Sequence, residues 1–322
     1  MEQKKVGIVT VTYNSGPVLQ PFLDCILEQT HTNFILYIID NVSTDNSVEI
    51  AKSYSDNRFV LFENDINSGV AGGNNQGIFA ALNDKCDYIW ILNNDVEFEK
   101  TYLEKLVQAS LTKNYSLVTS KMMYYFDKTL IWYAGSYFHK RSGNMASHDG
   151  MRETDKGQYN QDKEVDYAPT CSVLVKKEVF DDIGFMDEQY FAYYDDTDFL
   201  LRAHLNGKHK MWYIGDVEFY HKIGQSSQSK KGGIRKFKFG DFHIKLTTRN
   251  KVYYLRKQKN FIAFINVIYF YFRLNLRFLF SGKYHVNFKT WKIIQSSFLE
   301  GLKMELPEKD YKLIFNSLPN TL

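Results

Sequence analysis

Four short apolar runs within the first hundred residues constrain the fold more than any other feature of this sequence. They occupy 6–13, 34–40, 58–63 and 88–92, and they are rich in β-branched and aromatic residues. Such runs are typical of strands buried on both faces of a sheet. Helical patterns at 18–28, 47–54 and 74–82 separate them. Alternation of strand and helix predicts βαβ units, and therefore an α/β fold with a mainly parallel sheet.

Polar residues follow each predicted strand, at the sheet edge where ligands bind in such folds. The four segments are TYNS at 12–15, DNVSTD at 40–45, NDINSGVAGGNN at 64–75 and NND at 93–95. A strand-end carboxylate can accept hydrogen bonds from a base or a ribose. A Gly/Asn loop that opens a helix can offer N–H groups to a diphosphate, and a carboxylate such as Asp95 can bind a divalent cation. Each segment alone would equally suit a turn or a helix cap.

The order and spacing of these segments resemble family-two glycosyltransferases of the GT-A fold, and among them the bacterial rhamnosyltransferase-like members. The resemblance continues through FAYYDDTDFLLRAHLNGKH, FYHKIGQSS and TTRNKVYYLRK, so it covers about 6–260. It implies a Rossmann-like, mainly parallel central sheet flanked by helices. The catalytic domain would occupy 1–235, with a nucleotide-sugar-binding half at 1–100 and an acceptor-binding half at 101–235. A helical, membrane-associating extension would follow at 236–322.

The resemblance also implies roles for single positions. The nucleotide-sugar would be bound by Thr12, Tyr13, Asn14, Asp40, Asn41, Asn67, Gly73, Asn74 and Asn94. The family often has an Asp where Asn94 stands, and an amide adds no charge. Asp95 would therefore be the main acidic ligand of a divalent cation, Mn²⁺ or Mg²⁺, and His221 would complete the metal site. The Asn leaves open whether the metal is strictly required.

An acidic cluster, 195–198, stands where the family usually has Glu-Asp-x-Asp. In an inverting transfer, an acceptor hydroxyl attacks the anomeric carbon and a carboxylate removes its proton. We predict Asp196 as this base and Asp195 as the second candidate. Repulsion between neighbouring carboxylates raises the pKa of one of them. Asp198 is expected to cap the following helix, and Arg202 to form a surface salt bridge.

Charge is divided unevenly along the chain. Residues 1–221 carry 20 basic and 32 acidic groups, a net charge of −12, whereas residues 222–322 carry 20 basic and 5 acidic groups, a net charge of +15. Between Phe242 and Phe298 there is no Asp or Glu. A twelve-residue apolar run at 261–272 is too short to span a bilayer, so we expect no transmembrane helix there. Aromatic anchors flanked by cations predict instead an interfacial helix on anionic lipid, and a core helix is the alternative.

The predicted function is inverting transfer of a sugar, with L-rhamnose from dTDP-rhamnose as first choice, to a lipid-linked saccharide in bacterial surface polysaccharide synthesis. UDP-hexose or UDP-galactofuranose transfer, a nucleotidyltransferase and a catalytically weak nucleotide-sugar-binding scaffold are the alternatives. No apolar leader precedes the first strand, so we expect a cytoplasmic protein, peripheral at the inner face of the membrane. No nucleic-acid-binding module is recognised. The three cysteines form no disulfide framework, and a homo-oligomer stays open.

Overall fold

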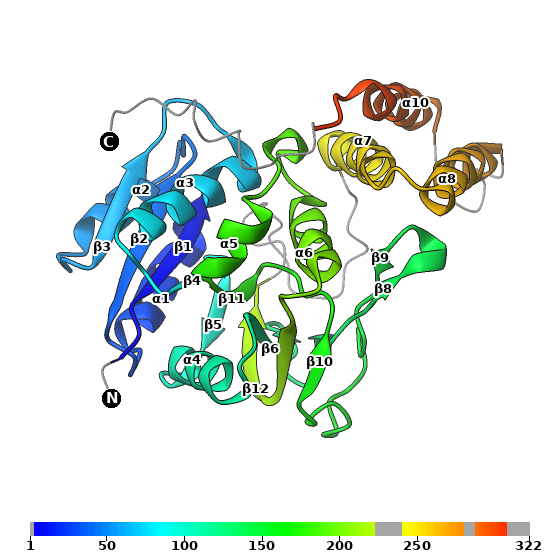
Figure 1. The fold of residues 1–322 in the computed structure, drawn as a ribbon. Coiled ribbons are helices and arrows are strands. Elements are labelled where there is room, and N and C mark those ends of the chain that lie inside the picture. Colours follow the sequence, from blue (N-terminus) through cyan, green and yellow to red (C-terminus); the bar gives the residue numbers. More distant parts are fainter. Residues whose placement is uncertain (1–2, 223–239, 280–286, 308–322) are drawn as a thin grey trace.

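A central sheet of ten strands organises the computed structural model, which describes residues 3–222, 240–279 and 287–307 (Figure 1). The main strand order is β10-β12-β6-β11-β4-β1-β2-β3, while β5 pairs with β12 and β7 pairs with β6. The strands of this sheet are β1 (Val6–Thr12), β2 (Phe34–Asp40), β3 (Phe59–Glu63), β4 (Tyr88–Leu92), β5 (Val96–Phe98), β6 (Leu117–Tyr124), β7 (Ile131–Tyr133), β10 (Lys163–Val165), β11 (Ser172–Lys176) and β12 (Met211–His221). A separate hairpin pairs β8 (Phe138–His139) with β9 (Met145–Ala146).

The four predicted strands are confirmed, and they form one parallel unit. β1 pairs in parallel with β2 and with β4, and β2 pairs in parallel with β3. Their carboxyl ends therefore lie at the same edge of the sheet. β11 then runs antiparallel to both β4 and β6, which makes the sheet mixed but mainly parallel. β12 returns to the parallel direction beside β6, so the end of β12 reaches the edge where β1 and β4 end.

The helices between residues 16 and 206 connect the strands and pack on the sheet. They are α1 (Gly16–Leu27), α2 (Ser47–Ser53), α3 (Gly69–Asn83), α4 (Tyr102–Lys113), α5 (Lys177–Ile183) and α6 (Asp195–Asn206), with 3₁₀ turns η1 (Lys140–Ser142) and η2 (Glu188–Tyr190). α3 packs on β1 and β2, and α4 packs on β6 and β12. Nearly every side chain of β1, β2 and β4 is buried between these layers. Burial on both faces explains why these strands read as continuous apolar runs in the sequence.

One helix begins earlier than the sequence predicts. The pattern predicted a helix at 74–82 after a glycine-rich loop, but α3 begins at Gly69. Its glycines meet the sheet: a Cβ on Gly73 would lie 2.8 Å from Val11, and one on Gly77 would lie 2.5 Å from Val9. The glycines bring this helix closer to β1 than any side chain would allow.

Among the described residues, three helices follow the sheet: α7 (Asp241–Lys257), α8 (Phe261–Leu279) and α10 (Phe288–Lys303). Figure 1 shows them grouped together, away from β1–β3. α7 packs against both α10 and α8. α8 is longer than the twelve-residue run expected from the sequence, and by length and composition alone it could cross a membrane. The domain boundary predicted at 235 lies outside the described residues.

Candidate active site

The ends of β1 and β2 are joined by a buried carboxylate. Asp40, the last residue of β2, accepts a hydrogen bond from the Thr12 hydroxyl (2.9 Å) and another from the backbone N–H of Ser43 (2.9 Å). Asp40 is 3% exposed and Thr12 is 1% exposed. These bonds fix the turn that follows β2, and with it the sequence DNVSTD. Asp40 therefore shapes the rim of the predicted nucleotide site.

Asn41 links the turn after β2 to the start of α3. Its amide N–H donates to the carbonyl of Gly69 (2.8 Å), and its amide oxygen accepts from Asn64 (3.0 Å) and Ser68 (3.2 Å). Asn67 accepts a hydrogen bond from the backbone N–H of Gly69 (2.9 Å). The predicted residues of the second and third segments thus form one connected polar network.

Tyr13 and Asn14 form the open side of this edge. The Tyr13 side chain is 52% exposed just beyond β1. Asn14 has a positive φ of 53°, and its amide oxygen accepts from the backbone N–H of Thr44 (2.8 Å). This contact ties the turn after β1 to the turn after β2. An exposed aromatic ring beside a fixed polar turn is a suitable surface for a nucleotide base.

The start of α3 differs from the predicted phosphate cradle. The N–H groups of Val70 and Ala71 both donate to the carbonyl of Phe191, at 2.6 and 3.3 Å. These two N–H groups therefore already have a protein acceptor, so they are not available to a diphosphate. Gly73 and Asn74 are buried inside the helix, with Gly73 against Val11 of β1. Tight packing explains this glycine-rich segment better than an open loop does.

The loop after β4 brings Asn94 and Asp95 to the same edge. The Asn94 amide donates to the carbonyl of Val11 at the end of β1 (2.8 Å). A carboxylate at position 94 would have no proton for this bond at neutral pH. The amide that departs from the family pattern therefore has a structural role in joining β4 to β1.

Asp95 and His221 form a buried pair, although they lie far apart in the sequence. β12 pairs antiparallel with β5, and this register sets His221 opposite Val96, directly beside Asp95. The Asp95 Oδ1 and His221 Nε2 atoms are 3.1 Å apart. Burial alone would raise the pKa of Asp95, but His221 holds it below the usual value. Burial opposes charge on His221 too, yet Cys171 and Asp95 raise its pKa well above the usual value.

This pair fits a divalent cation only with help from a ligand. It offers one carboxylate oxygen and one imidazole nitrogen, and the Nδ1 of His221 has no hydrogen-bond partner. Within the described parts of the chain, no cluster of three or more His, Cys, Asp or Glu side chains could hold a metal ion. Hard cations take about six oxygen ligands, so the diphosphate and water would have to supply the others.

The predicted catalytic carboxylates lie in the first turn of α6. Asp195 is 3% exposed, whereas Asp196 is only partly buried. Asp196 Oδ2 accepts from the Tyr167 hydroxyl (3.1 Å), while Oδ1 accepts from the backbone N–H of Thr197 (2.6 Å). Burial raises the pKa of both carboxyls, and repulsion from Asp196 raises that of Asp195 further. Of the two, Asp196 has the accessibility and the fixed orientation that a general base needs.

Asp198 and Arg202 serve a different purpose. Asp198 accepts from Arg202 Nε (3.0 Å) and lies 2.8 Å from Lys257 Nζ, and these cations hold its pKa below the usual value despite burial. Arg202 also donates to the carbonyls of Ile183 and Phe185. The expected surface salt bridge is therefore wrong: the Arg202 side chain is only 15% exposed. These two residues therefore hold the first turns of α6 against the neighbouring segments of the chain.

Aromatic rings connect the two acidic groups of the site. Trp132 packs edge-on against both His221 and His148, with ring centroids 5.2 and 4.9 Å apart. His148 in turn lies beside Tyr167 (6.1 Å), the residue that donates to Asp196. Burial lowers the pKa of His148, and the Asp196 charge opposes this shift. Sequence reasoning missed Trp132, His148 and Tyr167, because no local pattern marks them.

Asn250 on α7 is a further residue that sequence reasoning missed. Its amide donates to three backbone carbonyls, those of Tyr190 (2.9 Å), Ala192 (2.8 Å) and Tyr193 (2.8 Å). This loop leads into α6, and three of its non-glycine residues have positive φ: Phe191, Tyr193 and Tyr194. Such backbone persists only where its surroundings enforce it, and it gathers at functional sites. Asn250 therefore holds the strained loop from which Asp195 and Asp196 project.

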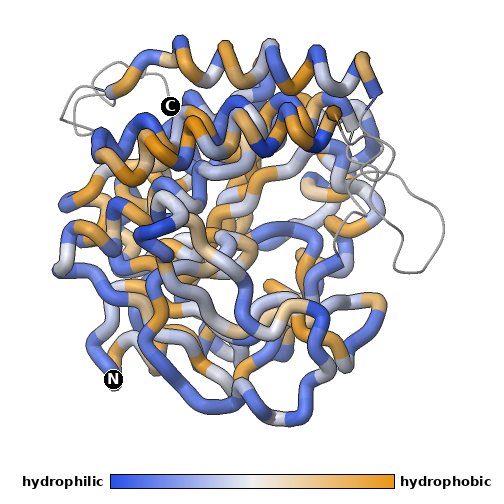
Figure 2. Tube along the Cα trace, turned by 90° about the vertical axis from the view of Figure 1, so that its right-hand side faces the viewer, coloured by the Kyte–Doolittle hydropathy of each residue, from blue (hydrophilic) through white to orange (hydrophobic). Residues whose placement is uncertain are grey.

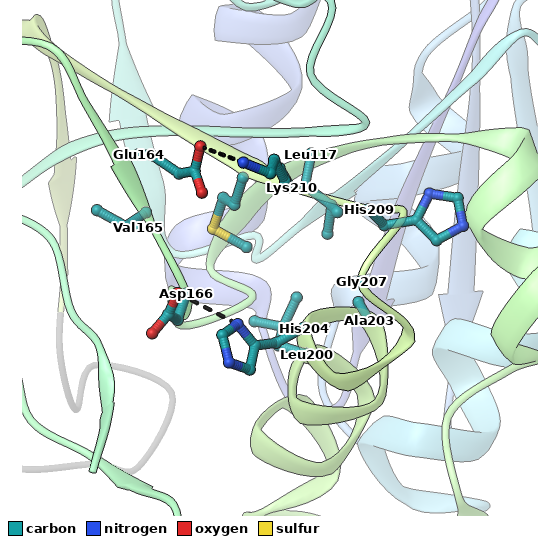
Figure 3. A pocket seen from close by; sticks show the side chains of 11 residues that line it. Leu117, Glu164, Val165, Asp166, Leu200, Ala203, His204, Gly207, His209 and Lys210 are labelled. Atoms are coloured by element: carbon teal, nitrogen blue, oxygen red, sulfur yellow. Dashed lines mark hydrogen bonds and ion pairs between the residues drawn. The ribbon is translucent and has the colours of Figure 1, made fainter.

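A separate hollow of about 220 Å³ lies at the opposite end of the sheet (Figure 3). It is bounded by the starts of β6 and β12 and by the last turn of α6. Two ion pairs flank it, Glu164 with Lys210 (3.1 Å) and Asp166 with His204 (3.2 Å). None of the predicted site residues lines it, so the hollow belongs to the amino ends of the strands.

Comparison with known proteins agrees with this arrangement. Residues 7–184 match the family described as Glycosyl transferase family 2. The chain is 27% identical over 225 residues to glycosyltransferase GlyG of Streptococcus pneumoniae, which covers 67% of this chain and 70% of that protein. It is 29% identical over 126 residues to the UDP-Glc:alpha-D-GlcNAc-diphosphoundecaprenol beta-1,3-glucosyltransferase WfgD of Escherichia coli, covering 37% of this chain and about half (49%) of WfgD.

The fold is also similar to that of a solved structure. The crystal structure of S. aureus TarS 1-349 in complex with UDP-GlcNAc matches with a TM-score of 0.57 at 15% identity, covering 92% of this chain and 81% of that one. This likeness concerns the fold. Together with the family match and the polar strand ends described above, it leads to one conclusion: the chain belongs to glycosyl transferase family 2 and is a glycosyltransferase of the GT-A fold.

Proposed function

We propose that this glycosyltransferase inverts the anomeric centre of a nucleotide-sugar as it transfers the sugar to a hydroxyl of its acceptor. The observation that carries the proposal is the continuous contact from Asp95 through His221, Trp132, His148 and Tyr167 to Asp196. This contact supports the proposal because it relates Asp95 and His221, the proposed pair on the diphosphate side, to Asp196, the proposed base. The donor-side residues lie at the ends of β1 and β2, at the same edge of the sheet as Asp95.

In the proposed mechanism, Asp196 is the base. As the acceptor oxygen bonds to the anomeric carbon, the bond from that carbon to the diphosphate oxygen breaks, and the acceptor proton passes to Asp196. Tyr167 and the first turn of α6 orient the carboxylate for this step. Its raised pKa brings its basicity closer to what proton removal needs near neutral pH.

Asp95 and His221 would hold Mn²⁺ or Mg²⁺ together with the donor diphosphate. When bound, a divalent cation offsets the charge that develops on the leaving diphosphate. The Asn at position 94 does not favour the inactive scaffold, because its amide is used in bonding to Val11.

For the substrates, we propose a lipid-linked saccharide acceptor and a nucleotide-hexose or dTDP-rhamnose donor. WfgD, by its name, acts on a diphosphoundecaprenol-linked sugar and uses UDP-Glc, and TarS was crystallised with UDP-GlcNAc. These relatives support the lipid-linked acceptor and UDP-sugars. Resemblance to rhamnosyltransferases alone supports dTDP-rhamnose, and UDP-galactofuranose stays in the panel.

The test begins with thermal unfolding in the presence of dTDP, UDP, GDP and their sugars, each with and without Mn²⁺ or Mg²⁺. A ligand at about 100 times its dissociation constant stabilises the protein by about 2.7 kcal/mol. We expect one nucleotide to raise the melting temperature in a metal-dependent way, and Asp95→Ala to remove the metal dependence.

Transfer is then followed with that donor. Asp196→Asn should retain donor binding and lose at least about 100-fold in kcat, which is the scale of general-base catalysis. Full activity in Asp196→Asn would contradict the assignment of the base. Donor binding by the native chain without transfer to any saccharide acceptor would favour the scaffold.

A further inference from the structure

The outward face of α8 is apolar along its whole length. Large side chains recur there at the spacing of a helix face: Phe261, Phe264, Ile265, Ile268, Tyr269, Phe272, Leu276 and Leu279. Phe261 is 76% exposed, and Phe264 and Phe272 are each 60% exposed. Figure 2 looks at this side of the molecule, and hydrophobic residues recur along the helix. Surface helices normally point such a stripe at the core, so this face is built to contact something else.

A second, narrower stripe attaches α8 to the protein. Its buried residues are Ala263, Val267 and Leu274. Tyr271 packs on Phe298 of α10 (5.0 Å), and Asn275 accepts a hydrogen bond from Trp291 of the same helix (3.2 Å). Three of the 19 residues of α8 are buried. α8 therefore contacts α7 and α10 through one narrow side, and its apolar face points outward.

Cations border this face. Arg273 and Arg277 are exposed on α8 itself, and Lys259 is exposed just before it. Lys140 and Arg141 are exposed on η1, which touches α8 where Asn266 donates to the carbonyl of Arg141 (3.1 Å). α8 contains no Asp or Glu. Large aromatic side chains suit the acyl chains of a lipid surface, and the Lys and Arg residues around them suit its anionic phosphates.

We propose that α8 docks this glycosyltransferase flat onto an anionic bilayer. The phenylalanines would enter the boundary between headgroups and acyl chains, and the arginines, Lys140 and Arg141 would meet lipid phosphates. The helix is attached edge-on to α7 and α10, and this attachment favours a position in the plane of the interface over one across the membrane. The proposal goes beyond the chemistry of transfer and does not depend on the donor.

The test uses the full chain and sedimentation with vesicles, of phosphatidylcholine alone or mixed with phosphatidylglycerol. We expect binding to the mixed vesicles that weakens as salt is raised, because screening acts on the cations. The double variant Phe264→Ser/Phe272→Ser should bind at least about tenfold more weakly. Arg273→Gln/Arg277→Gln should reduce binding to mixed vesicles toward that of phosphatidylcholine alone.

The matched control is Leu111→Ser/Leu205→Ser, which changes two other exposed apolar residues, one on α4 (49% exposed) and one on α6 (63% exposed). It should bind vesicles like the native chain, and circular dichroism should show all variants folded. Absence of binding to either vesicle, or binding that the phenylalanine variant leaves unchanged, would overturn the proposal.

Two further outcomes would also overturn it. A mass in solution twice that of one chain, which falls to one chain in the phenylalanine variant, would make this face a contact with a second copy. Resistance of the cellular protein to extraction by alkaline carbonate would make α8 a membrane-spanning helix.

Discussion

The Asn94 side-chain amide joins the loop after β4 to β1. Its N–H bonds to the Val11 carbonyl and so ties the loop that carries Asp95 to the end of β1. The neighbouring Asp95 is then fixed opposite His221. The proposed cation pair therefore has a single carboxylate, Asp95, and the Asn94 amide beside it helps to position that carboxylate.

Replacing Asn94 by Asp should destabilise the protein. The new carboxylate could not donate to Val11, so a partly buried carbonyl would lose this partner at a cost of about 1–3 kcal/mol. Chemical denaturation measures the loss in unfolding free energy. Asn67→Asp is the matched control, because Asn67 uses its oxygen as an acceptor and an Asp keeps that bond. Equal effects of the two substitutions would contradict this account.

Tyr167 should influence the pH at which kcat/KM falls on the acid side of its pH profile. Its hydroxyl donates to Asp196 and favours the charged carboxylate, so it lowers a pKa that burial raises. Tyr167→Phe removes this bond, which raises the pKa of Asp196. Because the base must be deprotonated, kcat/KM should begin to fall at a higher pH in the variant than in the native enzyme.

Assays of kcat/KM against pH, with donor and acceptor below saturation, measure this shift. A profile that moves to lower pH would show that Asp196 is not the group being titrated. An unchanged profile with reduced kcat would assign Tyr167 to packing alone.

At the scale of elements, α3 depends on its glycines for contact with the sheet. A Cβ at position 73 would lie 2.8 Å from Val11 Cγ2 and 2.9 Å from its Cγ1. Val11 is β-branched and sits in a strand, so it cannot turn away easily. The helix and the strand can approach this closely only because residue 73 lacks a side chain.

Gly73→Ala should therefore lower the unfolding free energy by about 1–3 kcal/mol, the usual cost of overpacking. Val11→Ala in the same chain should restore part of the loss, because it removes the methyl groups that clash. A double-mutant cycle measures this coupling. A cycle with no coupling energy would show that the strain lies elsewhere.

These elements also show what the sequence could and could not predict. β1, β2 and β4 were predictable because burial on both faces leaves an unbroken apolar run. The start of α3 was not, because glycines that pack a helix look like glycines that make a turn. α8 was predicted too short, because Arg273 and Arg277 interrupt the apolar run without ending the helix. The convergence of Asp95 and His221 followed from family likeness, since only the register of β5 and β12 brings them together.

At the scale of the whole molecule, α7 connects the C-terminal helices to the loop that leads to the predicted catalytic carboxylates. One side of this helix supports α8, and Asn250 on it binds the three carbonyls of the loop before α6. No local pattern marks an asparagine within a helix for this task, so sequence reasoning gave it no role. Asn250 and the loop that leads to the proposed base both lie beyond residues 7–184, the span that matches the family model.

Asn250→Ala should reduce kcat by about 10- to 100-fold, the scale expected when a reacting group moves by about 1 Å. The donor KM and the nucleotide-dependent thermal shift should change little, because the donor side is built from β1, β2 and β4. Steady-state kinetics with a soluble acceptor measures this. Asn266→Ala on the neighbouring α8 is the control and should retain kcat. A variant that loses donor binding instead would show that Asn250 supports the whole fold.

The bond between Asn250 and this loop has a consequence for exchanging parts between relatives. The segment around 190–198 and the helix at 241–257 form one structural unit, although they are far apart in the sequence. A chimera that takes α7, α8 and α10 from another enzyme would place against this strained loop a helix that evolved to hold a different loop. Such helices can be exchanged only together with the loop they hold.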